Sequence, residues 1–264
     1  MRIAKLILST LLTLFILGCV AVGMVYVQFK SELPDVESLK TVELQQPMQI
    51  YTSDGKLIGE VGEQRRIPVK LENIPEKLIQ AVLATEDSRF YEHHGLDPIG
   101  IARALMVTIN KGGTSQGAST ITQQLARNFF LTSEKTFTRK AKEAILAIEI
   151  ERKYTKDEIL ENYLNTIYFG QGAYGIKNAA IKYFNKQPKQ LTIAQAAILA
   201  SLPKSPTKYS KLENALERQK LVLHQMRNFG FISDAEYSQA IREKITFVNG
   251  NIKSRNEEEQ ISTS

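Results

Sequence analysis

The 264-residue chain has little of several features that would mark a special class of protein. It has one cysteine, Cys19, so no disulfide can form within the chain. Its 15 glycines and 8 prolines are too few for a fibrous or a largely disordered protein. With 43% hydrophobic residues, the composition is that of a globular chain, and one substantial core with appendages is the default expectation.

The chain also lacks a strong excess of either charge. It carries 34 basic and 28 acidic residues, a net charge of +6, and it has no basic run interleaved with aromatic residues. Nucleic acid is therefore not expected as a partner. Without Arg2 and Lys5, 32 basic residues stand against 28 acidic ones, which leaves +4. This excess fits a domain lying against anionic lipid, and it fits an ordinary solvated surface equally well.

One long hydrophobic run is present, at the N-terminus. Residues 6–27 contain no charged side chain, and a helix of that length, at ~1.5 Å per residue, can cross a hydrocarbon core of ~30 Å. Arg2 and Lys5 precede the run, so the positive-inside rule favours a cytoplasmic stretch over 1–5, a transmembrane helix over 6–27 and an exported remainder. The sequence before Cys19 faintly resembles a lipobox, but the following residues stay apolar, which favours plain anchoring over lipidation.

The next segments lead into a folded domain. Residues 28–46 are polar with little periodicity and predict a stalk. Residues 48–61 alternate around Asp54-Gly55, a dipeptide suited to a tight primed turn, which predicts a β-hairpin.

The remainder of the domain is predicted to be helical. Capping-box patterns begin at Thr155 and at Thr192, and further helix signals continue to Gly230. We therefore expect a mainly α domain over 47–230 with a small β-element at its entrance. Residues 231–264 are predicted to be a linker and a disordered tail, because the composition turns polar after Gly250.

The stretch EDSRFYEHHG, residues 86–95, places an acid where an apolar stripe should end. Glu86 follows Ile79, Val82 and Leu83 at i+7, i+4 and i+3, so it continues the core-facing side of a helix. It also lies near the helix C-terminus, where the macrodipole disfavours negative charge. An acid half-buried against apolar walls should have a raised pKa, which suits a general base or acid that works near neutrality.

Other residues around this stretch have plainer interpretations. The acid that opens it could form a structural ion pair with Arg89 or Arg103. Asp87 points elsewhere and could cap a helix or form a salt bridge. The adjacent His93 and His94, with no third ligand at metal spacing, are more typical of loop hydrogen bonds than of a metal site.

A second segment, GASTITQQLARN over 117–128, is rich in donors for sugar hydroxyls or phosphate oxygens. The plain alternative is a loop followed by a polar helix face. That alternative is weakened because the glutamines beside Leu125 cannot all face solvent. The candidate substrate-binding residues in this segment are Ser119, Thr120, Gln123, Gln124, Arg127 and Asn128.

A third segment places two cations and an acid on one helix surface. Arg139 and Glu143 are four residues apart, and Lys140 and Glu143 are three apart. Alone, this pattern is most typical of a solvated charged face. Beside a catalytic acid it could bind phosphate, with Glu143 orienting the two cations.

Five segments in this order resemble the motifs of a known family. They are EDSRFYEHHG, GASTITQQ, RKAKE, KDEILENYLN and GAYGIKNAAIKYF. The sequence resembles the glycosyltransferase domain of class A penicillin-binding proteins, the family 51 peptidoglycan glycosyltransferases, and among them the 1A type of Gram-negative bacteria. The resemblance implies a lysozyme-like, two-lobed, mainly α fold with a hydrophobic jaw at the membrane. Phe129, Phe130 and the apolar part of 99–109 are candidates for that jaw; burial of the two phenylalanines in the core is an equal alternative.

The resemblance implies polymerisation of lipid II into β-1,4-linked glycan, with inversion at the donor anomeric carbon and release of undecaprenyl diphosphate. Glu86 matches the catalytic glutamate that takes the proton from the acceptor 4-hydroxyl. Glu143 matches a second glutamate, which is thought to position the diphosphate-binding cations or a divalent metal. Arg139 and Lys140 would stabilise the departing diphosphate, and the residues of segment 117–128 would line the donor and acceptor sites.

No organic cofactor is implied, and a divalent cation, magnesium or manganese, is left open at Glu143. The implied partners are lipid II, the nascent glycan strand and inner-membrane lipid, with cell-wall synthesis partners or a homodimer left open. The implied location is the inner membrane, with the N-terminus cytoplasmic and the catalytic domain periplasmic.

Two features depart from the family. Asn185 stands where the fifth motif usually has glycine, and asparagine tolerates the left-handed conformation of a helix C-cap. Class A proteins also continue into a transpeptidase domain. The stretch from Ser201 to Lys204 has the Ser-x-x-Lys spacing of such a domain, but it follows an apolar helix and no Lys-Thr-Gly occurs in the sequence. We interpret it as a chance match and expect no penicillin acylation from this chain.

Two other functions stay open. A lytic enzyme of the same fold could cleave finished glycan, but hydrolysis of a neutral glycosidic bond needs no cations for a diphosphate. A catalytically silent, membrane-anchored remnant of a bifunctional protein would be indifferent to loss of Glu86.

Overall fold

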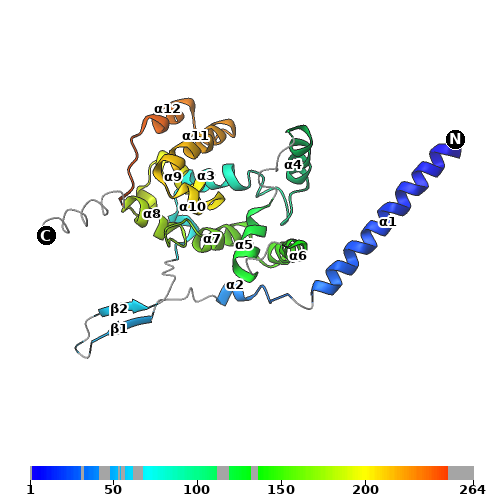
Figure 1. Ribbon diagram of the computed structural model, residues 1–264, viewed down its shortest axis with the longest axis horizontal. Coiled ribbons are helices and arrows are strands. Elements are labelled where there is room, and N and C mark those ends of the chain that lie inside the picture. The colour runs from blue at the N-terminus through cyan, green and yellow to red at the C-terminus, as the bar shows by residue number, and fades with distance from the viewer. Residues whose placement is uncertain are drawn as a thin grey trace, which may run out of the picture.

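The computed structural model describes residues 2–30, 33–41, 48–52, 54, 57–61, 68–111, 119–131 and 136–248. Most of these residues are helical (Figure 1), which confirms the predicted mainly α class. The helices are α1 (Arg2–Lys30), α2 (Ser38–Thr41), α3 (Glu76–Glu86), α4 (Pro98–Lys111), α5 (Ile121–Phe130), α6 (Phe137–Lys153), α7 (Lys156–Thr166), α8 (Ile176–Phe184), α9 (Ile193–Ser201), α10 (Pro206–Tyr209), α11 (Leu212–Asn228) and α12 (Asp234–Arg242). The short 3-10 turns are η1 (Leu71–Asn73), η2 (Pro188–Gln190) and η3 (Leu202–Lys204), and the strands are β1 (Met48–Tyr51) and β2 (Leu57–Val61).

Two groups of helices meet around the domain core. Helix α3 packs on α9 and α11, whereas α5 packs on α6 and α7. Helix α9 is buried on nearly all sides, and its sequence IAQAAILAS has alanine at four of nine positions. Small side chains allow neighbouring helices to approach closely, so α9 can lie against both α3 and α11. The C-terminal end of α3 is thereby held beside α11 and against the group that contains α5.

The domain continues beyond the predicted boundary at residue 230. Helix α12 begins with a capping box in which Ser233 accepts from the backbone of Glu236 and Glu236 accepts from the backbone of Ser233. Ile232, Ala240 and Ile245 are buried in the core. The predicted linker is therefore wrong for 231–248, because three apolar side chains dock this segment on the domain. The disordered tail predicted after Gly250 lies outside the described residues.

Part of the predicted stalk also packs on the domain. Val36 and Leu39 are each 4% exposed and belong to the core. Val36 lies in the turn that precedes α2, and Leu39 lies within α2. The Tyr154 hydroxyl donates to the Val36 carbonyl oxygen at 2.8 Å, and Lys153 pairs with Asp35 at 3.3 Å. Residues 33–41 are thus fixed to the C-terminal end of α6.

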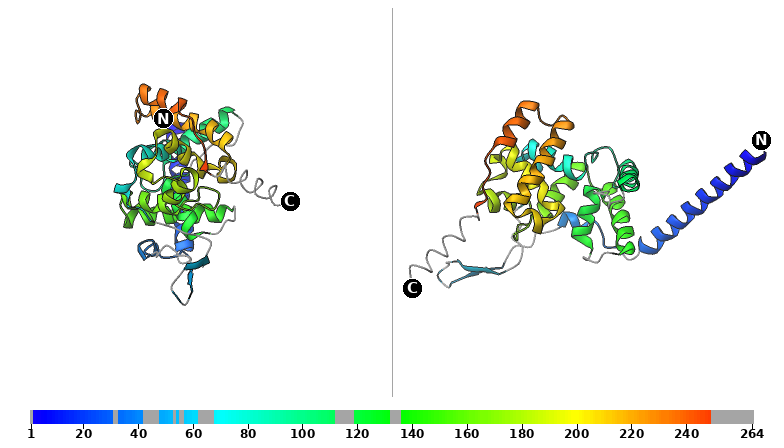
Figure 2. Two further views of the ribbon diagram at one scale, coloured as in Figure 1. Left: turned by 90° about the vertical axis from the view of Figure 1, so that its left-hand side faces the viewer. Right: turned by 45° about the horizontal axis from the view of Figure 1, so that its top comes forward.

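Two elements extend away from the helical body, and the C-terminal end of α1 touches α6, where the Tyr26 hydroxyl donates to Glu149 Oε1 at 2.8 Å. Helix α1 extends outward on one side, and the β1–β2 pair projects on another (Figures 1 and 2). The strands pair antiparallel, with Met48 opposite Val61, and Gly55 of the predicted turn lies outside the described residues. Among the helices of the described ranges, none has the length and apolar character needed to span a membrane. The predicted transmembrane helix over 6–27 is therefore not confirmed.

Candidate active site

The carboxylate of Glu86 lies at the C-terminal end of α3. Its Oε2 accepts a hydrogen bond from the Gln124 side-chain nitrogen at 2.9 Å. Its Oε1 is buried and has no hydrogen-bond partner among the described residues. The apolar residues before it, Val82 and Leu83, are 1% and 7% exposed, so the predicted stripe does face the core. Glu86 is half-buried at the end of that stripe.

The electrostatic surroundings of Glu86 combine burial with several cations. Burial raises the pKa of Glu86 above its usual range, and the hydrogen bond from Gln124 opposes this rise. The charges of Lys204, Arg218 and Arg127 also lower the pKa, so all three cations act on this carboxylate. Glu86 does not form the structural ion pair with Arg89 that was its plain alternative. Arg89 pairs instead with Glu92 at 2.8 Å and with Asp97 at 3.6 Å.

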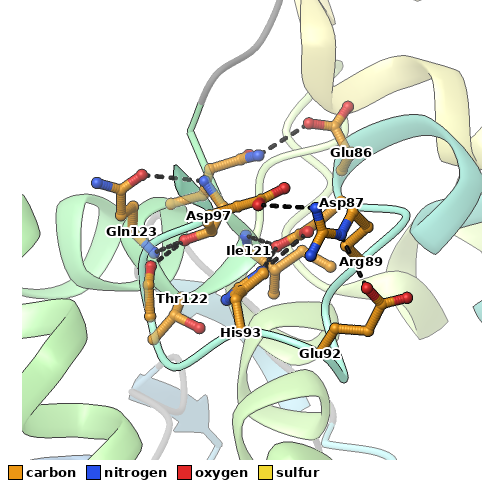
Figure 3. A network of polar contacts seen from close by, with 12 residues as sticks. Glu86, Asp87, Arg89, Glu92, His93, Asp97, Ile121, Thr122 and Gln123 are labelled. Atoms are coloured by element: carbon orange, nitrogen blue, oxygen red, sulfur yellow. Dashed lines mark hydrogen bonds and ion pairs between the residues drawn. The ribbon is translucent and has the colours of Figure 1, made fainter. Parts of the chain in front are cut away.

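Asp87 and His93 anchor the loop that follows Glu86. His93 Nε2 lies 3.0 Å from both carboxylate oxygens of Asp87, and Asp87 Oδ2 accepts from the backbone nitrogen of Ile121 at 3.0 Å. Figure 3 shows Glu86 pointing away from this pair. Asp87 thus both contacts the His93 ring and caps a helix, because Ile121 opens α5 and its N–H has no partner within the helix.

The glycine that closes this stretch is required by a close approach. Gly95 has φ +87°, and a β-carbon there would lie 2.8 Å from the carbonyl oxygen of Ala147 in α6. The Gly95 carbonyl accepts from the Thr120 hydroxyl at 2.6 Å. The loop after Glu86 is therefore hydrogen-bonded to the N-cap of α5 and lies close against α6.

Two of the predicted substrate-binding residues form the N-terminal cap of α5. The Thr120 hydroxyl accepts from the Gln123 backbone at 3.1 Å, and the Gln123 side chain accepts from the Thr120 backbone at 3.0 Å. Both residues are less than 5% exposed. Their polar atoms are committed to the helix terminus, which leaves Gln124 as the glutamine directed at Glu86.

The third predicted segment forms a compact group, the Glu143 cluster, made of Ser119, Arg139, Lys140 and Glu143. The Glu143 side chain is 1% exposed, with Arg139 Nη1 2.9 Å from one oxygen and Lys140 Nζ 2.8 Å from the other. Lys140 also donates to the Ser119 hydroxyl at 2.8 Å. A buried carboxylate thus holds two cations and ties them to the segment that leads into α5, so this is not merely a solvated charged face.

The remaining predicted residues on α5 are more open. Arg127 is half-buried and acts on Glu86 as described above, whereas Asn128 is exposed. Phe129 and Phe130 are partly buried and pack on the core, with ring centroids 4.8 Å apart. Helix α4, by contrast, exposes several large apolar side chains, which are Ile99, Ile101, Leu105, Met106, Val107 and Ile109.

Three residues at this site were not predicted from the sequence. Lys204 belongs to the Ser-x-x-Lys stretch that was interpreted as a chance match, and Arg218 lies mid-way along α11. Tyr163, in α7, donates from its hydroxyl to Gln124 Oε1 at 3.3 Å. All three lie far from Glu86 in sequence. Local periodicity alone could not have found them. For Lys204, its position at the end of an apolar helix was a usable signal of a functional cation.

The residues around Glu143 do not form a ready metal site. Both of its oxygens already lie within 3 Å of a cationic nitrogen. In the part of the chain that is described, no group of three or more His, Cys, Asp or Glu side chains is placed to hold a metal ion.

Comparison with known proteins places the five motif segments within one protein family. A family model described as "Transglycosylase" matches residues 54–227, which is more than half of the chain. The chain belongs to the transglycosylase family. This confirms the resemblance to the glycosyltransferase domain of class A penicillin-binding proteins.

Relatives of this transglycosylase chain are much longer proteins. It is 61% identical over 248 residues to "Penicillin-binding protein 1A" of Haemophilus influenzae, covering 93% of this chain and 28% of the relative. It is 50% identical over 248 residues to the protein of the same name from Escherichia coli, covering 93% and 29%. A crystal structure of penicillin-binding protein 1A from Haemophilus influenzae matches at 35% identity and a TM-score of 0.45, covering 78% of this chain and 22% of that one. The chain thus spans less than a third of the length of these relatives.

Proposed function

We propose that this chain is a peptidoglycan glycosyltransferase that polymerises lipid II, the undecaprenyl-diphosphate-linked GlcNAc-MurNAc-pentapeptide. The observation that carries the proposal is Glu86, a half-buried carboxylate with a raised pKa, one unpartnered oxygen and several cations acting on it. A base of this kind is suited to take a proton from a sugar hydroxyl near neutral pH.

In the proposed reaction, Glu86 takes the proton from the 4-hydroxyl of the acceptor GlcNAc. The hydroxyl oxygen then attacks the anomeric carbon of the donor MurNAc from the face opposite the diphosphate. The bond from that carbon to the diphosphate oxygen breaks, and its electron pair leaves with undecaprenyl diphosphate. Attack from the opposite face inverts an α-linked donor into a β-1,4 bond.

The leaving group needs charge neutralisation more than it needs a proton, because it is a phosphate ester. A glycosidase, whose leaving group is a sugar alcohol, would need a second carboxyl to protonate the leaving oxygen. Arg139 and Lys140 of the Glu143 cluster support diphosphate binding, since a buried acid holds both in place. Lys204, Arg218 and Arg127 add positive charge on the Glu86 side. No step of the proposed reaction is assigned to a metal ion. The exposed Asn128 and the half-buried Ser119 are proposed to contact the sugars.

The proposed location is the inner membrane, with the N-terminus on the cytoplasmic side and the domain in the periplasm. The uncharged run over 6–27 and the cations before it support this orientation. The exposed apolar side chains of α4 support contact of the domain with lipid. Exposed to water, such a group of apolar side chains would promote aggregation. We also propose the finer description of the domain as lysozyme-like and two-lobed, on the strength of its motifs.

The test is incubation of the purified full chain with labelled lipid II. Glycan polymer is the expected product, and the Glu86→Gln variant should form it at least about 100-fold more slowly. Soluble fragments released from preformed glycan would instead indicate a lytic enzyme. Absence of both activities in the wild-type chain would indicate a catalytically silent remnant.

A further inference from the structure

The two oxygens of the Glu86 carboxylate have different surroundings. Oε2 accepts from the Gln124 amide at 2.9 Å, whereas Oε1 is buried with no hydrogen-bond partner in the described ranges. A buried acceptor without a donor is costly in a folded protein. Such an atom is expected where a ligand supplies the missing proton, and the Oε1 atom of Glu86 meets that description.

The Gln124 amide is itself held by a hydrogen bond on the side opposite Glu86. The Tyr163 hydroxyl donates to Gln124 Oε1 at 3.3 Å. Tyr163 is 1% exposed and Gln124 is 7% exposed, so neither polar group is free to turn toward bulk water. The three side chains come from α3, α5 and α7, and their hydrogen bonds join these helices in one line that ends at Glu86.

The direction of these hydrogen bonds is fixed by charge. Burial raises the pKa of the Tyr163 phenol well above its usual range, so Tyr163 stays protonated and can donate. An ionised Glu86 needs the NH₂ group of Gln124 toward it, because a carbonyl oxygen in that place would be repelled. Both ends therefore select the same orientation of the amide, and hydrogen bonds aligned in this way strengthen one another.

We propose that Tyr163 and Gln124 are positioning residues that hold Oε2 of Glu86, so that Oε1 is the oxygen that takes the proton of the acceptor hydroxyl. This inference rests on the proposed function. In the step concerned, the O–H bond of the hydroxyl breaks, a new H–Oε1 bond forms, and the hydroxyl oxygen bonds to the anomeric carbon as the diphosphate leaves. Gln124 acts through Glu86 in this arrangement and does not line a sugar site.

The test compares Tyr163→Phe and Gln124→Met in the full chain with a matched control, Tyr183→Phe. Tyr183 is also 1% exposed, and its hydroxyl donates to the Phe169 carbonyl oxygen at 2.9 Å. Each Tyr→Phe change removes one buried hydroxyl, but only Tyr163→Phe breaks the line to Glu86. The measurements are initial rates of polymer formation from labelled lipid II across pH, and thermal unfolding of each variant.

Gln124→Met removes a hydrogen bond that favours ionised Glu86, so the acid limb of its pH–rate profile should move to higher pH by about one unit. We expect its kcat to fall about tenfold or more with KM unchanged. Tyr163→Phe should shift the limb in the same direction with a kcat loss of about threefold, and Tyr183→Phe should leave the limb in place. The double variant should be no slower than Gln124→Met alone, because both changes act through one contact.

Several results would overturn the inference. The line of hydrogen bonds is wrong if Tyr163→Phe and Tyr183→Phe have the same acid limb, or if the effects of Tyr163→Phe and Gln124→Met multiply. A higher KM for Gln124→Met with an unchanged limb would return Gln124 to a sugar site. If Tyr163→Phe does not fold, the acid limb of the Gln124→Met pH–rate profile decides whether the amide acts on Glu86.

A second readout separates this inference from the proposed function. The infrared carboxylate band that is lost in Glu86→Gln reports the protonation of Glu86 without any turnover. Its midpoint should move to higher pH in Gln124→Met and in Tyr163→Phe. If the wild-type chain forms no polymer, the proposed function fails. The infrared midpoints then still decide whether the two residues act on Glu86, and unmoved midpoints would refute that.

Discussion

Replacing Glu86 by glutamine should change activity and stability in opposite directions. Glutamine keeps an oxygen for the hydrogen bond from Gln124 but removes the negative charge from a half-buried position. The loss of a general base lowers rates by about 10²–10⁴-fold. The same change removes an ion that the folded protein holds at a cost, so the variant should gain stability on the order of 1 kcal/mol at neutral pH. For a domain of this size that corresponds to about 2–4 °C in Tm.

The pH dependence of the gain follows from the direction of the pKa shift. Burial raises the pKa of Glu86, so the folded protein binds this proton more tightly than the unfolded chain does. The wild type therefore loses stability as pH rises through the folded-state pKa, and the glutamine variant does not. The advantage of Glu86→Gln should be absent below the unfolded-state pKa and complete above the folded-state pKa.

The assay is thermal unfolding of both proteins from about pH 4 to about pH 8, combined with lipid II polymerisation at neutral pH. Glu92→Gln is the matched control, because Glu92 lies in the same loop but is largely exposed and pairs only with Arg89 among its described contacts. It should leave both readouts nearly unchanged. A Glu86→Gln variant that is no more stable at neutral pH, or whose advantage does not vary with pH, would refute the burial argument. A variant that keeps a tenth of the wild-type rate would refute its role as the base.

Three further variants test other parts of the site and fold. Glu143→Gln should lower both Tm and the polymerisation rate, because the buried acid that holds Arg139 and Lys140 is lost. We expect the rate to fall by about 100-fold or more. Wild-type rates would contradict the proposed diphosphate site. Lys204→Ala should slow polymerisation by about tenfold or more and move the acid limb to higher pH, since Lys204 lowers the pKa of Glu86. An unchanged profile would contradict a role for Lys204 at this site. Asn185→Ala should cost about 1 kcal/mol of unfolding free energy, because the residue has φ 52° and ψ 40°, whereas Asn185→Gly should cost nothing; equal Tm values for the two would count against strain at this C-cap.

Much of the local structure could be predicted because it depends on short-range contacts. The capping boxes at Thr155 and Thr192 form as predicted, and Asn185 adopts the left-handed conformation at the C-cap of α8. A helix terminus is decided by side chains within about four residues of it. The same rule would have found α12, whose Ser233 and Glu236 form an equivalent box.

The contacts of adjacent residues in the second segment could not be predicted in the same way. Gln123 and Gln124 differ by one position, yet one completes the cap of α5 and the other reaches Glu86. One residue along a helix turns a side chain by about 100°, so the face is predictable but its neighbour across the interface is not. Likewise, Val36 and Leu39 are too few to give a periodic signal, and only the presence of α6 beside them explains their burial.

The sequence alone determined the family, the order of the five motifs and the position of an acid at the end of an apolar stripe, because these depend on residues that are close together in the chain. The tertiary structure decided which groups surround that acid. Tyr163, Lys204 and Arg218 act at or near Glu86 from α7, η3 and α11. Which distant side chains meet is set by how helices pack around one core, and no local pattern in the sequence records that choice.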